Sequence, residues 1–113
     1  MLRISAKGRP IGAVEVAETM RSRVVGLLGR TSLAPGSGMY LSPCLQIHTW
    51  FMRFAIDVVF IDGQGRVVRV HDSLAPFRRA WGGLRARAVI ELPAGTAREA
   101  GLQRGDRLEL EAA

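Results

Sequence analysis

The sequence predicts a mainly β protein: a compact antiparallel β-sandwich or partial barrel, with one packed helix in the N-terminal half and a short helical turn near the C-terminus. Two observations support this prediction. Short segments of alternating apolar and polar residues recur along the chain, and turns rich in glycine and proline separate them. Only residues 20–28 carry apolar side chains at helical spacing over more than two turns.

The length and composition indicate one domain. The 113 residues are 48% hydrophobic, so we expect a single core and a single domain over residues 1–113. The opening MLRISAKGRP lacks the apolar stretch of a secretory signal, and the longest apolar run is far shorter than the ~20 residues of a membrane span. A single cysteine fits a reducing compartment. We therefore expect a cytoplasmic protein without membrane insertion.

The first half of the chain predicts three short strands and the helix. Residues 2–5 and 11–17 alternate as strands around a KGRP turn, and residues 39–41 form a third short strand. Thr19 is suited to cap the helix N-terminus. The apolar stripe of that helix consists of Met20, Val24, Leu27 and Leu28. This spacing is typical of a helix that packs on a sheet.

The strongest strand signal lies at residues 54–62, where both faces are apolar apart from Asp57. A preceding strand over residues 44–51 places Gln46, His48 and Trp50 on one face. The sequence GQG after Asp62 predicts a three-residue hairpin loop with Gly65 in a left-handed conformation. The strand after this loop covers residues 66–71.

The remainder of the chain alternates loops and short elements. Residues 72–84 contain proline, a Gly-Gly pair and arginines, which predicts a mobile basic loop. A strand at residues 85–92 follows, and Thr96 is placed to cap a helix of one to two turns that ends at Gly101. The last strand is RLELE, residues 107–111.

Asp57 is the sharpest feature of the sequence, because a carboxylate in an apolar central strand is costly to bury without a partner. Counting back from a GQG loop places Asp57 opposite His71, with Arg69 diagonal to it. We therefore expect Asp57 to be held by His71, by Arg69 or by backbone donors.

The chain is basic, with a formal net charge of +6 and all but one of its 16 basic residues being arginine. Such a charge is compatible with nucleic-acid binding. The arginines are spread along the chain, however, and the one dense patch consists of Arg78, Arg79, Arg85 and Arg87. We favour a solvated basic surface over a nucleic-acid interface.

The residues that could support catalysis or metal binding are few. Cys44 and His48 lie four residues apart on a predicted strand, about 13 Å from each other, which is too far for a nucleophile and its base. The candidate metal ligands are Cys44, His48, Asp57 and His71. Their spacing matches no familiar metal site, and no phosphate-binding glycine motif is present, so we expect neither a metal nor a cofactor.

Three motifs together resemble a known family. They are GLLGR at residues 26–30, HTWFMRFAIDVVFID at residues 48–62 and ELPAGTAREAGLQRGD at residues 91–106. The combination resembles domain-of-unknown-function family 192, also catalogued as uncharacterised protein family 0127. The resemblance implies a compact β-sandwich domain and no established activity, substrate or cofactor. Many members carry a proline next to the position of Asp57, where this sequence has Ala55 and Ile56.

The function favoured by these observations is a small binding or accessory module for an anionic small molecule or a peptide segment. The expected ligand-binding residues are His48, Thr49, Trp50, Arg53 and Asp57, with a further arginine from the 72–84 loop. One alternative is a hydrolase-like enzyme in which His48 works with Asp57. A second is a weak nucleic-acid binder that uses the loop from Arg78 to Arg87. No residue is assigned a catalytic role, and a non-enzymatic module is preferred.

Overall fold

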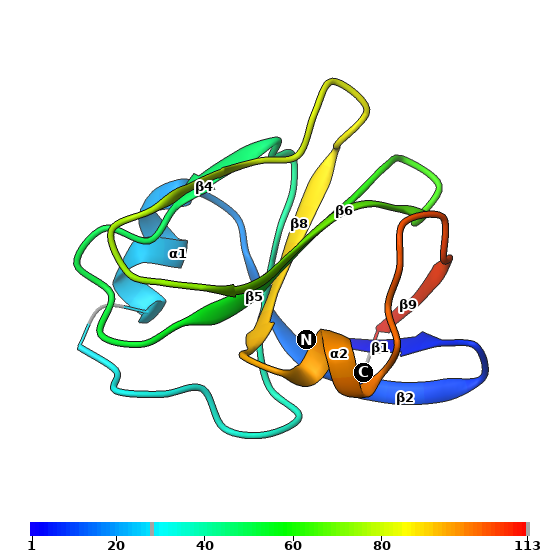
Figure 1. The fold of residues 1–113 in the computed structure, drawn as a ribbon, viewed down its shortest axis with the longest axis horizontal. Helices are drawn as coiled ribbons and strands as arrows, with labels where there is room; N and C mark the ends of the chain where they lie inside the picture. Colours follow the sequence, from blue (N-terminus) through cyan, green and yellow to red (C-terminus); the bar gives the residue numbers. More distant parts are fainter. Residues whose placement is uncertain (28, 113) are drawn as a thin grey trace.

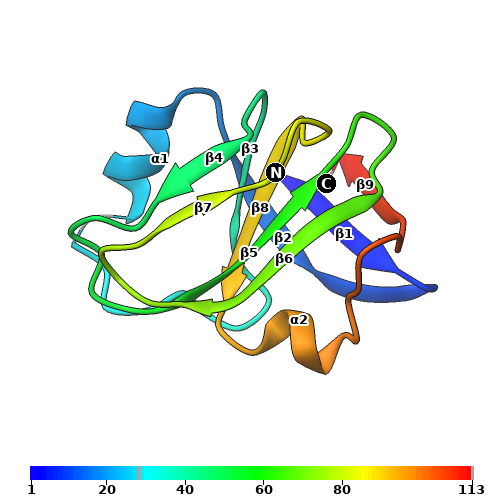
Figure 2. The same ribbon diagram turned by 45° about the horizontal axis from the view of Figure 1, so that its top comes forward.

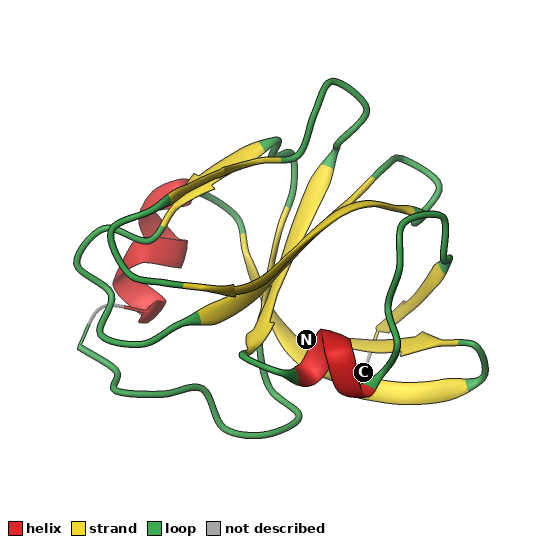
Figure 3. Ribbon diagram, in the orientation of Figure 1, coloured by secondary structure: helices red, strands yellow, loops and turns green. Residues whose placement is uncertain are grey.

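The computed structural model describes residues 1–27 and 29–112. Strands dominate it, as Figure 3 shows. The strands are β1 (Leu2–Ala6), β2 (Arg9–Ala17), β3 (Met39–Leu41), β4 (Gln46–His48), β5 (Ile56–Ile61), β6 (Val67–Leu74), β7 (Arg79–Trp81), β8 (Ala88–Pro93) and β9 (Leu108–Ala112). The helices are α1 (Met20–Leu27) and α2 (Thr96–Glu99). The predicted mainly β fold with one helix and one helical turn is confirmed.

Seven strands form one curled sheet in the order β6-β5-β8-β3-β2-β1-β9, and β4 pairs with β7 in a separate small sheet. All neighbouring strands in the large sheet are antiparallel except β2 and β3. The two edges of the large sheet meet at one point, where the Leu108 amide donates to the Gly65 carbonyl at 2.8 Å and the Val67 amide to the Asp106 carbonyl at 2.7 Å. The sheet is therefore a partial barrel, closed at one corner only.

Two apolar cores lie on opposite faces of the large sheet, and β5 contributes to both. Val58 and Phe60 pack with residues of α1, β4 and β7. Val59 and Ile61 pack with residues of β1, β9 and α2. All six residues of β5 are buried, as expected for a central strand covered on both sides. Figure 1 shows α1 and β4 at one end of the molecule and α2 with β9 at the other, and Figure 2 shows β4 and β7 running together beside α1.

The helix α1 begins as its sequence predicts. The Thr19 side-chain oxygen accepts a hydrogen bond from the Ser22 amide at 3.0 Å, and the Thr19 amide donates to the Ser22 hydroxyl at 3.1 Å, which is a reciprocal N-terminal cap. Leu27 is buried against the sheet. The side chains of Met20 and Val24, and Leu28 as a whole, lie outside the described part of the chain.

The hairpin between β5 and β6 confirms the predicted loop and corrects the predicted register. The Gly65 amide donates to the Asp62 carbonyl at 3.1 Å, and Gly65 has φ 81°. A bulge in β6 after Val67 then shifts the pairing by one residue. His71 therefore lies opposite Val58 and not opposite Asp57, as the simple count from the loop had predicted.

Replacing Gly65 with alanine is expected to lower the free energy of unfolding by about 1–2 kcal/mol, because its φ is positive and a Cβ there would lie 2.9 Å from the Leu108 carbonyl oxygen. Urea denaturation measures this. Gly63→Ala in the same loop is the matched control, since its Cβ would meet nothing closer than 3.9 Å. Equal effects of the two substitutions would contradict the assigned loop geometry.

The largest differences between the predicted and the observed elements lie in three places. The segment 72–84 is not one loop, because β6 continues to Leu74 and residues 79–81 form β7. The strand predicted over 44–51 is only Gln46–His48, since the chain turns after it and Phe51 has φ 66°. Gly95, and not Thr96, is the N-cap residue of α2. Neither helix of the described chain has the length and apolar character that a membrane crossing requires.

Candidate functional site

The candidate site lies on the outer face of the small β4–β7 sheet. The middle residues of these strands, Ile47 and Ala80, are buried in the core. Because side chains alternate along a strand, the residues on either side of them point outward. The pairing places His48 directly opposite Arg79 on this outer face.

Trp50 connects these two side chains. Its ring stacks on the imidazole of His48, with centroids 4.7 Å apart and planes inclined by 24°. The guanidinium carbon of Arg79 lies 5.0 Å from the centroid of the Trp50 ring. A shallow pocket of 240 Å³ is lined by Gln46, Ile47, His48, Trp50 and Arg79. None of these lining residues is acidic, so the pocket carries positive charge and a flat aromatic wall.

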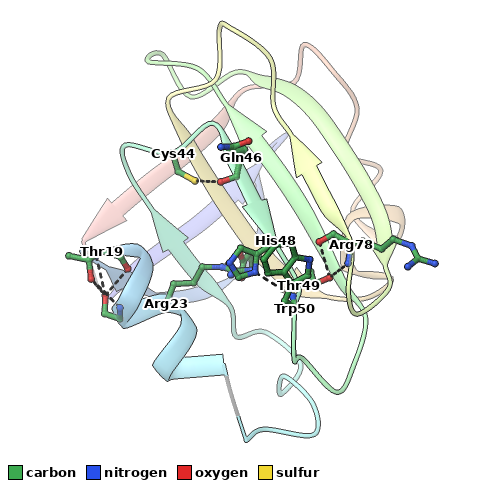
Figure 4. Close-up of polar contacts among 10 residues, drawn as sticks. Thr19, Arg23, Cys44, Gln46, His48, Thr49, Trp50 and Arg78 are labelled. Atoms are coloured by element: carbon green, nitrogen blue, oxygen red, sulfur yellow. Dashed lines mark hydrogen bonds and ion pairs between the residues drawn. The ribbon is translucent and has the colours of Figure 1, made fainter.

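The electrostatic environment of His48 favours its neutral form. Partial burial lowers the pKa of His48 below its ordinary value, and the positive charges of Arg23 and Arg79 lower this pKa further. Figure 4 shows the Arg23 side chain extending from α1 towards His48 and Trp50. The charge of Arg23 is itself paired with Glu91, so Arg79 is the cation that lines the pocket beside His48.

Thr49 supports the site without lining it. Its side chain is fully buried, and its hydroxyl donates to the Ala75 carbonyl at 2.7 Å and accepts from the Arg78 amide at 2.9 Å. The Thr49 amide also donates to the Arg78 carbonyl at 2.8 Å (Figure 4). These bonds join the loop after β4 to the segment before β7, and they hold Trp50 and Arg79 at the same end of the small sheet.

Asp57 and Arg53 do not join the other predicted site residues. Asp57 is fully buried, and its two carboxylate oxygens accept hydrogen bonds from the backbone amides of Ser73 and Ala97, each at 2.8 Å. Backbone donors were one of the predicted partners of Asp57; His71 and Arg69 are not its partners. Arg53 is exposed and lies outside the pocket. The structure thus brings together only His48 and Trp50 of the five predicted residues, with Thr49 behind them.

The structure gives His48 a different set of contacts from those that a catalytic pair would need. The Nδ1 atom of His48 accepts a long 3.4 Å hydrogen bond from the Trp50 amide, while both oxygens of Asp57 are occupied elsewhere. Cys44 donates to the Gln46 carbonyl at 3.1 Å, and burial raises the pKa of its thiol. Within residues 1–27 and 29–112, no three His, Cys, Asp or Glu side chains come together as ligands for a metal ion.

A buried ion pair beside the site was missed at the level of sequence. Arg23 of α1 bonds through Nε to a carboxylate oxygen of Glu91 on β8, and their exposed fractions are only 2% and 1%. Among the described residues, the second nitrogen branch of Arg23 (Nη2) and the second oxygen of Glu91 have no hydrogen-bond partner. Burial raises the pKa of Glu91, and the charge of Arg23 opposes this rise. Glu91 was detectable in principle, since it is the single acid in the apolar segment AVIELP.

Comparison with known proteins identifies the family of this chain. The family model described as uncharacterized ACR, domain of unknown function 192, matches residues 2–110. The chain belongs to this family. Family 192 relatives include two UPF0127 proteins, from Pyrococcus abyssi and Pyrococcus horikoshii, each 33% identical to this chain. The match spans 87% of this chain in both cases, and 86% and 87% of the two relatives.

A solved structure supports the fold of this family 192 chain. A protein of unknown function from Novosphingobium aromaticivorans superimposes with a TM-score of 0.82 at 22% identity, over 96% of this chain and 82% of that one. At this identity the similarity establishes the shared fold. The resemblance predicted from the three sequence motifs is confirmed by the family match.

Proposed function

We propose that this domain is a binding module for a small anionic ligand, held in the pocket formed by Gln46, His48, Trp50 and Arg79. The observation that supports this most strongly is the stack of Arg79, Trp50 and His48 around a pocket without an acidic lining residue. This assignment keeps His48 and Trp50 from the sequence-based hypothesis. It omits Arg53 and Asp57, adds Gln46 and takes Arg79 as the arginine expected from residues 72–84.

The chemistry of these side chains fits a carboxylate or phosphate group. A guanidinium that stacks on an aromatic ring keeps its N–H edges free, and those edges match two oxygens of an anion. The His48 imidazole and the Gln46 amide add further donors on the same face. The indole of Trp50, 40% exposed, offers apolar area to a flat part of the ligand. A peptide with a free carboxylate presents the same group.

Calorimetric titration with adenosine monophosphate tests the proposal, with uncharged adenosine as the control ligand. We expect binding of the monophosphate only, and Arg79→Gln should weaken it by about 10-fold or more, because a charge-assisted hydrogen bond contributes roughly 1.5–3 kcal/mol. Arg53→Gln is the matched control variant and should leave the affinity unchanged. Equal weakening by both variants would contradict the proposed site, as would an absence of binding to adenosine monophosphate, inorganic phosphate and citrate.

The affinity should also depend on pH in a defined direction. A bound anion favours the imidazolium form of His48 and so raises its pKa relative to the free protein, where this pKa is lowered. The complex then takes up a proton, and binding becomes stronger as pH falls through the pKa of His48 in the complex. The gain is complete once the pH lies below its pKa in the free protein. A His48→Gln variant should lose this dependence, and an unchanged pH profile in that variant would refute the role of His48.

A further inference from the structure

The outer face of the small sheet carries more than the anion pocket. Trp81 lies two residues after Arg79 on β7, so the two side chains share this face and are spaced about 6.6 Å along the strand. Trp81 is 47% exposed and lies opposite Gln46 of β4. The face therefore presents two partly exposed indoles, Trp50 and Trp81, with Arg79 between them.

A second arginine extends this arrangement beyond β7. The guanidinium carbon of Arg69, on β6, lies 5.6 Å from the centroid of the Trp81 ring. Its Nη1 atom donates to the Trp81 carbonyl at 3.0 Å, which fixes its position. The order across the surface is thus Arg69, Trp81, Arg79 and Trp50, an alternation of cations and aromatic rings that we call the Arg–Trp row.

The Trp81 end of the row opens into an arginine-lined cleft of 440 Å³. Three segments far apart in the sequence meet there: the start of β6, the loop between β7 and β8, and the turn before β9. The arginines that line it are Arg66, Arg69, Arg85 and Arg104. The loop between β7 and β8 can pack closely on β5 because residue 82 is glycine. A Cβ there would lie 2.4 Å from the Phe60 ring.

The charge of this cleft is largely uncompensated. None of the four arginines forms an ion pair with a described residue. The one acid in the lining is Asp62, whose Oδ1 atom accepts hydrogen bonds from the backbone amides of Gln64 and Arg66. The positive charges of Arg66 and Arg85 also act on Asp62 and favour its ionised form. The four arginines and the one aspartate therefore give the lining of this cleft a net charge of +3.

We propose that the Arg–Trp row and the arginine-lined cleft bind single-stranded nucleic acid. Its phosphates would contact the arginines, and a base would stack on the exposed indole of Trp81, since the Trp50 ring already contacts His48 and Arg79. Proteins that bind single strands with little sequence preference combine a basic groove with aromatic side chains on which bases stack. An acidic peptide would use the arginines but leave the indole of Trp81 without a flat partner, and a duplex keeps its bases stacked inside. This inference rests on the proposed function, because Trp50 and Arg79 belong to both.

The test is fluorescence anisotropy of a labelled single-stranded oligonucleotide, with the duplex of the same sequence and adenosine monophosphate measured in parallel. We expect the single strand to bind more tightly than the duplex or the mononucleotide. Its affinity should fall steeply with added salt. Trp81→Ala should reduce the affinity by about 5- to 100-fold, with substantial recovery in Trp81→Phe. The double variant Arg85→Glu/Arg104→Glu should reduce it at least as much.

The matched control is Arg3→Glu/Arg21→Glu, which makes the same change in charge at exposed positions outside the row and the cleft. An equal loss in this control, or duplex binding as tight as single-strand binding, would overturn the inference in favour of general electrostatic attraction. Binding of adenosine monophosphate with no gain for the oligonucleotide would overturn the inference while supporting the anion pocket. Binding of neither ligand would contradict both proposals.

Discussion

Replacing Arg23 with methionine is expected to lower the free energy of unfolding by about 3–5 kcal/mol. Arg23 and Glu91 form an ion pair that is almost completely removed from solvent, inside the core between the large sheet and α1. Without the guanidinium, the Glu91 carboxylate stays buried among apolar side chains such as Val58 and Met39, which flank it on β5 and β3. Chemical denaturation at neutral pH measures the loss.

Two further measurements separate this explanation from a simple loss of packing. Replacing both partners, as Arg23→Met/Glu91→Leu, should restore most of the stability, because the buried charge is removed together with its partner. The second measurement is the pH dependence of the free energy of unfolding. Burial already raises the folded-state pKa of Glu91, and removing Arg23 raises it further. Since the folded state then holds a proton that the unfolded state releases, the single variant loses stability as pH rises from the unfolded-state pKa to the folded-state one.

The destabilisation by Arg23→Met should therefore be smallest in acid and largest at neutral pH and above. A loss that does not change with pH, or a double variant as unstable as the single one, would show that Glu91 is not held as a buried carboxylate by Arg23.

Asp57→Ala should lower the free energy of unfolding by about 3–5 kcal/mol, and Asp57→Asn by roughly half as much. The carboxylate accepts one hydrogen bond from Ser73 at the end of β6 and one from Ala97 at the start of α2. Alanine leaves two backbone donors without acceptors in a buried region, whereas asparagine retains one acceptor oxygen. Thermal and urea denaturation measure these differences.

The same variants distinguish a structural role of Asp57 from a role in the site. Because Asp57 is fully buried and bound by backbone amides, the folded Asp57→Asn protein should bind adenosine monophosphate as tightly as the parent protein. A protein of parental stability that has lost ligand binding would contradict this explanation and would revive Asp57 as a partner of His48.

The sequence predicted the strands because their alternation reflects burial on one face, as in β1, or on both faces, as in β5. It also predicted the hairpin loop, since glycine adopts the positive φ of Gly65 without strain and leaves room for the Leu108 carbonyl. The register of His71 was predicted wrongly, because a bulge within β6 has no strong local signal.

The site was harder to predict because it depends on contacts between distant segments. His48 and Trp50 could be placed on one face from their alternation. Their pairing with Arg79 depends on β7, a three-residue strand inside a segment whose glycines and proline favour a loop. The arginine-lined cleft was missed for the same reason, since its residues come from three segments that the fold brings together. Asp57 stood out in the sequence because it is an acid within an apolar strand. In the structure its buried carboxylate stabilises the fold by accepting hydrogen bonds from the Ser73 and Ala97 amides.

The most direct test of the anion pocket is an NMR titration of the His48 imidazole with and without adenosine monophosphate. In the free protein we expect the pKa of His48 to lie below its ordinary value of 6.5, because of burial and the charges of Arg23 and Arg79. With adenosine monophosphate bound, this pKa should rise. A His48 titration midpoint that is unchanged by the ligand would contradict the proposed site.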